Sequence, residues 1–246
     1  MKIFFLAAGQ GSRIKGFEKS NKCLIKINNK FLINYHLDNL KKMKIDNINI
    51  ITGHNANNLK KNLLNKKLNF YYNKNYKKMN IASSIHTALI NSKDDTLISY
   101  TDVIYEAKII KYFEKKKFKR IVIPVLKNWK KIWKQRKVSI YSDAEELLTY
   151  KRKITSIGSK FNKSNFTKYQ FMGIIFIPKN VLPLFSSKFS NNKLFKMDST
   201  TLINYLINEG FEINYKVYDG IWFEFDFLKD VENFQRYYNI NKIKNK

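Results

Sequence analysis

The sequence predicts an α/β protein built on a mixed, mostly parallel sheet that is flanked by helices. The chain opens with a short apolar run at residues 2–6, as a buried parallel strand does. Further strand-like runs at residues 47–52 and 96–100 alternate with stretches whose apolar residues recur at helical spacing. The 246 residues are 44% hydrophobic, so they can form a sizeable core in one domain or two small ones.

The predicted elements follow one another in a regular order. Strands are expected at residues 2–6, 47–52, 69–72, 96–100, 119–126 and 219–226, and helices at residues 31–42, 59–68, 80–90 and 197–210. Residues 235–246 are expected to form a basic, fraying helical tail. The chain has only three prolines and eight glycines, which argues against long linkers, so we expect a single domain over residues 1–246.

The chain is strongly basic, with 47 Lys and Arg residues against 19 Asp and Glu residues and a net charge of +28. Such a charge is typical of nucleic-acid-binding proteins. The alternative is compositional drift, because Lys, Asn, Ile, Phe and Tyr are abundant together and the positive residues are spread along the whole chain. We favour drift, and a basic surface would still attract small anionic substrates.

Cysteine content and hydropathy bear on the compartment. The single cysteine, Cys23, excludes an intramolecular disulfide and fits a reducing cytoplasm, and we expect it to pack in the core or line a site. No apolar run approaches about 20 residues, so no membrane span is expected. We therefore expect a cytoplasmic protein.

A glycine-rich turn directly follows the first strand. Its residues are Leu6, Ala7, Ala8, Gly9, Gln10, Gly11, Ser12 and Arg13. Gly9 and Gly11 permit backbone angles that place several N–H groups on one side, and such a nest binds oxyanions. Arg13 adds a planar fork for phosphate oxygens, and Lys22 adds a movable positive charge. Two glycines alone are also typical of an ordinary turn, and the segment is neither a dinucleotide fingerprint nor a P-loop.

The whole string is more specific than its glycines. Followed by Lys22, Cys23 and Leu24, it resembles the signature of the nucleotidyltransferases that activate sugars and alcohol phosphates, although their usual Pro before the lysine is Asn21 here. This resemblance implies a Rossmann-like, GT-A-like fold in which the loop holds a nucleoside triphosphate. It implies catalytic roles for Lys22, Arg13 and Asp102. The nucleotide-binding residues that it implies are Leu6, Ala7, Ala8, Gly9, Gly11, Ser12, Arg13, Lys22, Asn80, Ser83, Ser84 and Asp102.

Three acids lie at or near predicted strand ends. Asp102 follows the strand at residues 96–100, and open α/β sheets bind ligands at the carboxyl ends of their strands. Glu224 and Asp226 are two residues apart in an alternating stretch, so both carboxylates point to one face and repel each other unless a cation lies between them. Chance alternation on a solvent-exposed face is the alternative. The resemblance makes these three acids ligands of Mg²⁺, which prefers oxygen ligands.

A group of aromatic and acidic residues occupies the second half of the chain. Trp129 and Trp133 are four residues apart, so on a helix they share one face. They either pack in the core or, with Asp143 and Glu145, line an acceptor pocket suited to a cationic amine. The order of these residues, with Arg136 and the segments 154–160 and 169–173, resembles the cytidylyltransferases that activate phosphocholine, 2-aminoethylphosphonate or phospho-L-glutamine. The acceptor-binding residues that it implies are Trp129, Trp133, Asp143, Glu145 and Tyr169.

The resemblance implies a Mg²⁺-dependent cytidylyltransferase. It would join CMP from CTP to a small amine-bearing phosphate or phosphonate, release pyrophosphate, and serve the decoration of a surface glycan or lipid. Residues 1–105 would bind the nucleotide, residues 106–240 the acceptor, and residues 241–246 would form the tail. The alternatives are a sugar-1-phosphate nucleotidyltransferase that uses UTP or another nucleotide, and a basic nucleic-acid-binding protein. We expect no specific nucleic acid partner, and a monomer or a homodimer.

Overall fold

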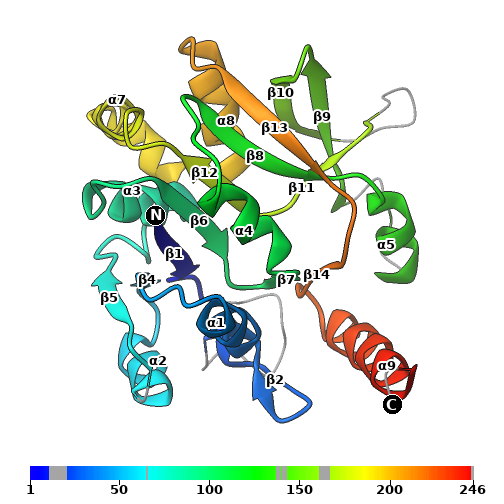
Figure 1. Ribbon diagram of the computed structural model, residues 1–246. Helices are drawn as coiled ribbons and strands as arrows, with labels where there is room; N and C mark the ends of the chain where they lie inside the picture. The colour runs from blue at the N-terminus through cyan, green and yellow to red at the C-terminus, as the bar shows by residue number, and fades with distance from the viewer. Residues whose placement is uncertain (11–20, 65, 137–138, 140–142, 161–166, 245–246) are drawn as a thin grey trace.

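A ten-stranded sheet forms the centre of the molecule (Figure 1). The computed structural model describes residues 1–10, 21–64, 66–136, 139, 143–160 and 167–244. The strands lie in the order β5 (Asn69–Tyr72), β4 (Ile48–Thr52), β1 (Lys2–Ala7), β6 (Thr96–Tyr100), β12 (Ile174–Ile177), β8 (Ile121–Leu126), β13 (Ile213–Tyr218), β10 (Lys153–Lys160) and β9 (Glu145–Tyr150), and β11 (Gln170–Phe171) pairs with β8. The predicted α/β class is confirmed.

The first four strands of this order are all parallel, so their carboxyl ends meet at one edge of the sheet. β1 lies between β4 and β6, with Leu6 opposite Tyr100 and Ala7 opposite Thr52. It is buried on both faces, because Phe5 belongs to the apolar cluster on one side and Phe4 to the cluster on the other. This explains why the strand is a continuous apolar run instead of an alternating one.

Helices cover both faces of the sheet (Figure 1). Those whose apolar residues join the cluster on one face are α1 (Leu32–Lys42), α2 (Ala56–Leu63), α4 (Lys108–Glu114) and α5 (Trp129–Arg136). Those on the other face are α3 (Ile81–Ile90), α7 (Leu182–Lys188) and α8 (Ser199–Asn208), with the 3-10 turn η2 (Asn192–Lys196). The helix α9 (Leu228–Lys244) packs through Phe234 on a small separate cluster.

The strand β12 enters the middle of the sheet antiparallel to both of its neighbours, β6 and β8. Gly173, directly before it, has a φ of 72°, a conformation that L side chains rarely adopt. A Cβ on this residue would lie 2.9 Å from the Tyr100 ring, while the Gly173 carbonyl accepts a hydrogen bond from the Tyr100 N–H at 2.9 Å. Glycine therefore allows the chain to enter the sheet beside the end of β6.

Two small antiparallel pairs complete the fold. The 3-10 turn η1 (Lys22–Leu24) leads into the pair β2 (Lys26–Ile27) and β3 (Lys30–Phe31). The second pair joins β7 (Val103–Tyr105) to β14 (Trp222–Glu224), so it brings a segment near the carboxyl end of the chain back to the end of β6.

Several elements differ from the sequence-based expectation. The helix predicted at residues 59–68 is α2, which ends at Leu63, and the strand predicted at residues 219–226 is reduced to β14. Strands β9, β10 and β13 were not predicted, because most of their residues are partly or fully exposed and give a weak periodic signal. The short buried strand β12 was also missed. Within the described residues, no helix is both long and apolar enough to cross a membrane.

Candidate functional site

A pocket of about 460 Å³ opens at the carboxyl ends of the parallel strands. It is lined by Leu6, Ala7, Ala8, Gly9, Gln10, Lys22, Cys23, Asn73, Tyr76, Met79, Asn80, Ile81, Ser83, Ser84, Tyr100, Thr101, Asp102 and Asp226. Every described residue that the sequence assigns to nucleotide binding is among them. The pocket therefore brings together segments that end β1, β5 and β6 with the start of α3 and the residues after β14.

The glycine turn is described only as far as Gln10. Gly11, Ser12 and Arg13, which the sequence assigns to phosphate binding, lie outside the described residues. The φ of Gly9 is not in the left-handed region, so this residue does not use the backbone freedom that glycine allows. Among the described residues, no atom lies within 4 Å of where a Cβ on Gly9 would be, so its small size leaves open space on this side of the pocket.

The ammonium group of Lys22 lies between two carboxylates at the pocket wall. Its Nζ donates hydrogen bonds to Asp102 Oδ2 at 2.8 Å and to Asp226 Oδ1 at 2.7 Å. Although burial opposes it, the charge of these two carboxylates raises the pKa of Lys22 above its ordinary value. Lys22 is therefore a fixed positive charge at this wall, and its side chain is 15% exposed.

Backbone and side-chain bonds explain why the two acids meet. Thr101 Oγ1 donates to the Leu6 carbonyl at 2.9 Å, which ties the end of β6 to the end of β1. In the β7–β14 pair Glu224 lies opposite Val103, and the Phe225 N–H donates to the Asp102 carbonyl at 2.9 Å. This pairing places Asp226, the residue after Phe225, beside Asp102, although the two acids are more than a hundred residues apart in the chain.

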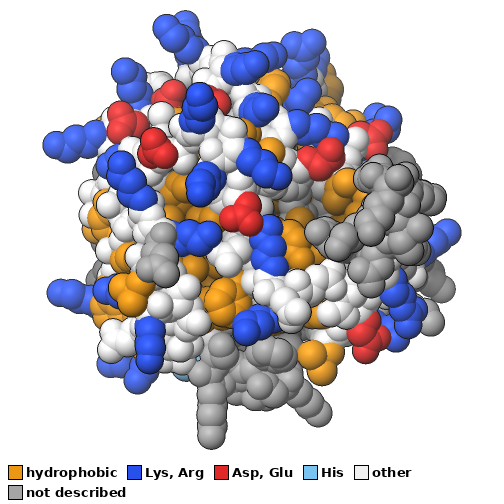
Figure 2. Space-filling model, turned by 60° about the horizontal axis from the view of Figure 1, so that its bottom comes forward, with side chains coloured by type: hydrophobic (Ala, Val, Ile, Leu, Met, Phe, Trp, Pro, Cys, Tyr) orange, Lys and Arg blue, Asp and Glu red, His pale blue; other side chains and the backbone are white. Residues whose placement is uncertain are grey.

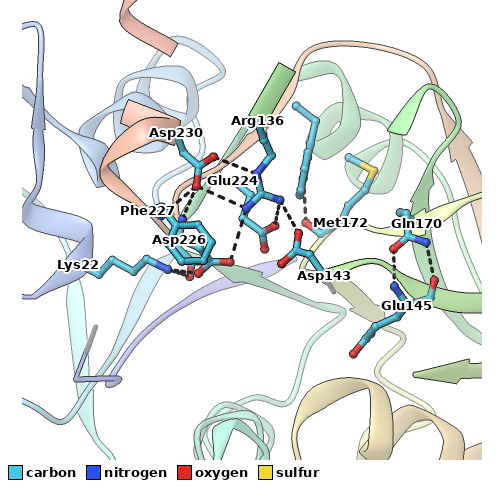
Figure 3. Close-up of polar contacts among 12 residues, drawn as sticks. Lys22, Arg136, Asp143, Glu145, Gln170, Met172, Glu224, Asp226, Phe227 and Asp230 are labelled. Carbon is cyan, nitrogen blue, oxygen red and sulfur yellow. Dashed lines mark hydrogen bonds and ion pairs between the residues drawn. The ribbon is translucent and has the colours of Figure 1, made fainter. Parts of the chain in front are cut away.

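The guanidinium of Arg136, from α5, lies between Glu224 and Asp226 (Figure 3). Its Nη1 lies 3.0 Å from Glu224 Oε2, and its Nη2 lies 3.8 Å from Asp226 Oδ2. Both acids of the alternating stretch thus reach one cation, which is an arginine, although β14 ends at Glu224 and Asp226 lies beyond the strand. Burial and the nearby Asp226 carboxylate raise the pKa of Glu224 above its usual range, and Arg136 opposes this shift.

The predicted metal-binding set of three acids is not assembled. Within the described part of the chain, no three Asp, Glu, His or Cys side chains converge as ligands for one ion. Asp102 and Asp226 share Lys22, whereas Glu224 accepts from Arg136 and does not line the pocket. The sequence could predict that Glu224 and Asp226 share a face but not which cation that face meets.

Asn73 connects the pocket to the start of α3 and was missed by the sequence analysis. Its Nδ2 donates to Ser83 Oγ at 2.8 Å and to Ser84 Oγ at 3.0 Å, and the Asn73 side chain is buried. Ser83 Oγ donates in turn to the carbonyl of Asn80, whose side chain caps α3 through the Ile81 N–H. Asn73 directly follows a predicted parallel strand, so its position at the shared carboxyl edge was a usable signal.

The aromatic residues assigned to the acceptor pack in the core instead of facing the pocket. Trp129 and Trp133 are 1% and 3% exposed, and Trp133 stacks on Trp222 at 5.6 Å between ring centroids. They do share one helix face, but that face points inward onto β14. Tyr169 is also buried and packs against Tyr215. Of the two readings left open by the sequence, the structure fits core packing for both tryptophans.

The two acids assigned to the acceptor occupy different surroundings (Figure 3). Asp143 Oδ2 lies 3.0 Å from Arg136 Nη1, close to Glu224. Glu145 lies further away, where its Oε1 accepts from Thr200 Oγ1 at 3.2 Å. Burial, with the charges of Asp198 and Asp143, raises the pKa of Glu145 above its usual range. The structure therefore does not join these acids and the tryptophans into one pocket.

Comparison with known proteins identifies the family of this chain. A model of the family described as MobA-like NTP transferase domain matches residues 3–146, more than half of the chain. The chain belongs to this family. The NTP transferase is also 30% identical to the CTP:phosphoglutamine cytidylyltransferase of Campylobacter jejuni, over 94% of its own length and 98% of that protein. The prediction of a nucleotidyltransferase is confirmed.

Solved structures show the same fold as this NTP transferase. One is the inositol-1-phosphate CTP transferase of T. maritima, at 18% identity and a TM-score of 0.75, with 94% of each chain covered. Another is the CTP:phosphocholine cytidylyltransferase of Streptococcus pneumoniae, at 16% identity and a TM-score of 0.72, with 96% of this chain and 97% of that chain covered. At these identities the likeness concerns the fold alone.

Proposed function

We propose that the protein transfers CMP from CTP to a small phosphorylated or phosphonate acceptor and releases pyrophosphate. The observation that carries this proposal is the position of Lys22 Nζ, within 2.8 Å of both Asp102 and Asp226 at the wall of a pocket at the sheet's carboxyl edge. Choice of CTP is supported by the 30% identical relative, which is a CTP:phosphoglutamine cytidylyltransferase. A phospho-amino acid is therefore the first acceptor to test, followed by phosphocholine and 2-aminoethylphosphonate.

The chemistry needs positioned charge more than a general base. A phosphate or phosphonate oxygen of the acceptor attacks the α-phosphorus of the nucleotide, and the bond from that phosphorus to the bridging oxygen of pyrophosphate breaks. The attacking oxygen is already anionic, so no proton has to be removed and no covalent enzyme intermediate forms. Lys22 lies where it can bind the triphosphate, and it stabilises the negative charge that moves onto the leaving pyrophosphate.

The acids at the pocket wall fit a divalent cation. Asp102 and Asp226 already hold one positive charge between them, and Mg²⁺ is held in proteins by one or two carboxylates together with substrate phosphates. We propose these two residues as its ligands and leave out Glu224, which is paired with Arg136. When bound, such an ion would neutralise charge on the phosphates.

The proposal is tested by measuring pyrophosphate release with Mg²⁺ for each combination of CTP, UTP, ATP or GTP with phospho-L-glutamine, phosphocholine, 2-aminoethylphosphonate or glucose 1-phosphate. We expect turnover with CTP and one of the amine-bearing acceptors. Asp102→Asn should abolish it, and Asp38→Asn, which removes an acid of α1 that pairs with Lys30 and Lys66, should not. Turnover only with UTP and glucose 1-phosphate would replace the proposal with a sugar-nucleotide reaction.

The net charge of +28 calls for a second measurement. Figure 2 shows Lys and Arg side chains scattered over one face of the molecule, not gathered in a single patch. We therefore expect only weak, nonspecific binding to DNA or RNA. Tight binding with a steep salt dependence, in a protein that transfers no nucleotide, would favour the nucleic-acid-binding alternative. We also propose that the CMP-activated acceptor serves the decoration of a surface glycan or lipid.

A further inference from the structure

Arg136 is almost completely buried, yet its guanidinium faces four carboxylates (Figure 3). The side chain is 4% exposed and lies over the ring of Trp133, 5.1 Å from its centroid. The acids are Asp143, Glu224, Asp226 and Asp230. A buried arginine with this many partners is held in one orientation, because its planar fork has donors in fixed directions.

Asp230, in the first turn of α9, is the most buried of these acids. Its two oxygens accept from Arg136, Oδ1 from Nε at 3.0 Å and Oδ2 from Nη2 at 3.4 Å. Asp230 Oδ2 also accepts from the backbone N–H groups of Asp226 at 3.0 Å and of Phe227 at 2.9 Å. A single carboxylate thus fixes the arginine and the backbone of the segment that carries Asp226.

Asp226 is consequently held at three points. Its backbone N–H donates to Asp230, its Oδ2 faces Arg136 at 3.8 Å, and its Oδ1 accepts from Lys22 at 2.7 Å. The charges alternate from the pocket inward, from Asp102 through Lys22 and Asp226 to Arg136. Because Oδ2 of Asp226 is turned toward Arg136, its Oδ1 is turned toward Lys22 at the pocket wall.

We propose that Arg136 and Asp230 are positioning residues that orient the Asp226 carboxylate for the nucleotidyl-transfer site. The inference rests on the proposed function and extends it to two residues that do not line the pocket. They act through the orientation of Asp226 and touch no substrate. A lysine in place of Arg136 would keep the charge but could not bond both oxygens of Asp230 while also facing Asp226.

The test combines turnover with direct ion binding. Mn²⁺ binding to the protein with CTP is measured by electron paramagnetic resonance, and kcat and KM for CTP by pyrophosphate release. Residues that support a metal ligand typically change metal affinity or activity about 10- to 100-fold when they are replaced. We expect Asp230→Asn and Arg136→Lys to weaken Mn²⁺ binding and lower kcat by about this factor, with little change in the KM for CTP.

Glu106→Gln is the matched control. Glu106 also accepts a backbone N–H beside β14, from Ile221 at 2.9 Å, and it accepts from Tyr218 at 2.7 Å, but it does not contact Arg136. We expect this variant to lose some thermal stability and to keep Mn²⁺ binding and kcat.

Wild-type values for Asp230→Asn or Arg136→Lys would overturn the inference, as would an equal loss in Glu106→Gln or the absence of Mn²⁺ binding to the wild type. If Asp230→Asn does not fold, Arg136→Lys decides. If the wild type binds Mn²⁺ but transfers no nucleotide, the proposed function fails, and the Mn²⁺ titration of the variants still decides the inference.

Discussion

Lys22 Nζ lies 2.7 Å from Asp226 Oδ1, although 204 residues separate the two in the chain. The contact joins the segment after the first strand to the segment before the last helix. It exists because β14 pairs with β7 directly after Asp102, which brings the segment before α9 to the edge of the sheet where β1 and β6 end.

Removing the positive charge of Lys22 should nearly abolish transfer. In Lys22→Met the triphosphate loses a positioned cation, and removal of one such charge-stabilising donor typically lowers kcat about 10²- to 10³-fold. The measurement is pyrophosphate release with CTP and the best acceptor. Lys26→Met is the control, because Lys26 is an exposed lysine on the neighbouring β2 strand and should keep the wild-type rate. Equal rates for the two variants would contradict the role of Lys22.

Asn73 should matter for nucleotide binding more than for the chemical step. Asn73→Ala removes the donor that holds Ser83 and Ser84, whose hydroxyls line the pocket. We expect the KM for CTP to rise about tenfold, equivalent to about 1.4 kcal/mol, with a smaller change in kcat. Asn62→Ala is a suitable control, because Asn62 is exposed on α2 and its side chain donates to Asn58 in the same helix. An unchanged KM would show that this network is structural only.

Trp129 should contribute to stability and not to acceptor binding. The side chain is 1% exposed and packs edge to face with Trp133, so Trp129→Ala leaves a large cavity and should lower the free energy of unfolding by about 3–5 kcal/mol. Urea denaturation measures this loss. Tyr150→Ala, at a ring that is 63% exposed, should have almost no effect. A strongly raised acceptor KM in the folded Trp129→Ala protein would instead restore the acceptor role predicted from the sequence.

His36 should make the fold sensitive to mild acid. It is buried between the rings of Phe5 and Tyr105, and its Nε2 lies 2.5 Å from the Val103 carbonyl. Burial lowers the pKa of His36 to about 4, with the Val103 bond and the Asp102 charge opposing the shift. The unfolded chain binds this proton below about pH 6.5 and the folded chain does not, so stability is lost as the pH falls from about 6.5 toward 4.

The expected loss from His36 is about 2 kcal/mol between pH 7 and pH 5. Urea denaturation at several pH values measures it, and His36→Gln, which keeps a donor for Val103 but does not titrate, should show a flatter profile. Identical profiles for wild type and variant would mean that other groups cause the acid sensitivity.

Local sequence patterns predicted which segments meet at the pocket. An unbroken apolar run followed by glycine indicated the buried strand β1, and Asp102 was recognised because it follows a second such strand. Parallel strands end at a common edge, so residues far apart in sequence could be expected in one place. Asn73 follows the same rule after β5 and could have been found by it.

The surroundings of the residues assigned to the acceptor were harder to predict, because residue spacing does not show which way a helix face or a strand side points. The spacing of Trp129 and Trp133 defined a shared helix face but not whether it turned toward solvent or toward Trp222. In the same way, the spacing of Glu224 and Asp226 predicted a shared side of one strand, but it could not show that the strand ends at Glu224 or which cation the two acids contact.

The sequence by itself determined the first strand, the α/β class, and the presence of Asp102 at the carboxyl edge. These follow from periodicity and from the geometry of parallel strands, which act over short stretches, whereas the role of Lys22 was implied by the family resemblance. Only the tertiary structure decided that Lys22 forms ion pairs with both Asp102 and Asp226, that Arg136 pairs with Glu224, and that the tryptophans face the core. Those outcomes depend on which distant segment packs against each side chain, and a strongly basic chain offers many cations to few acids.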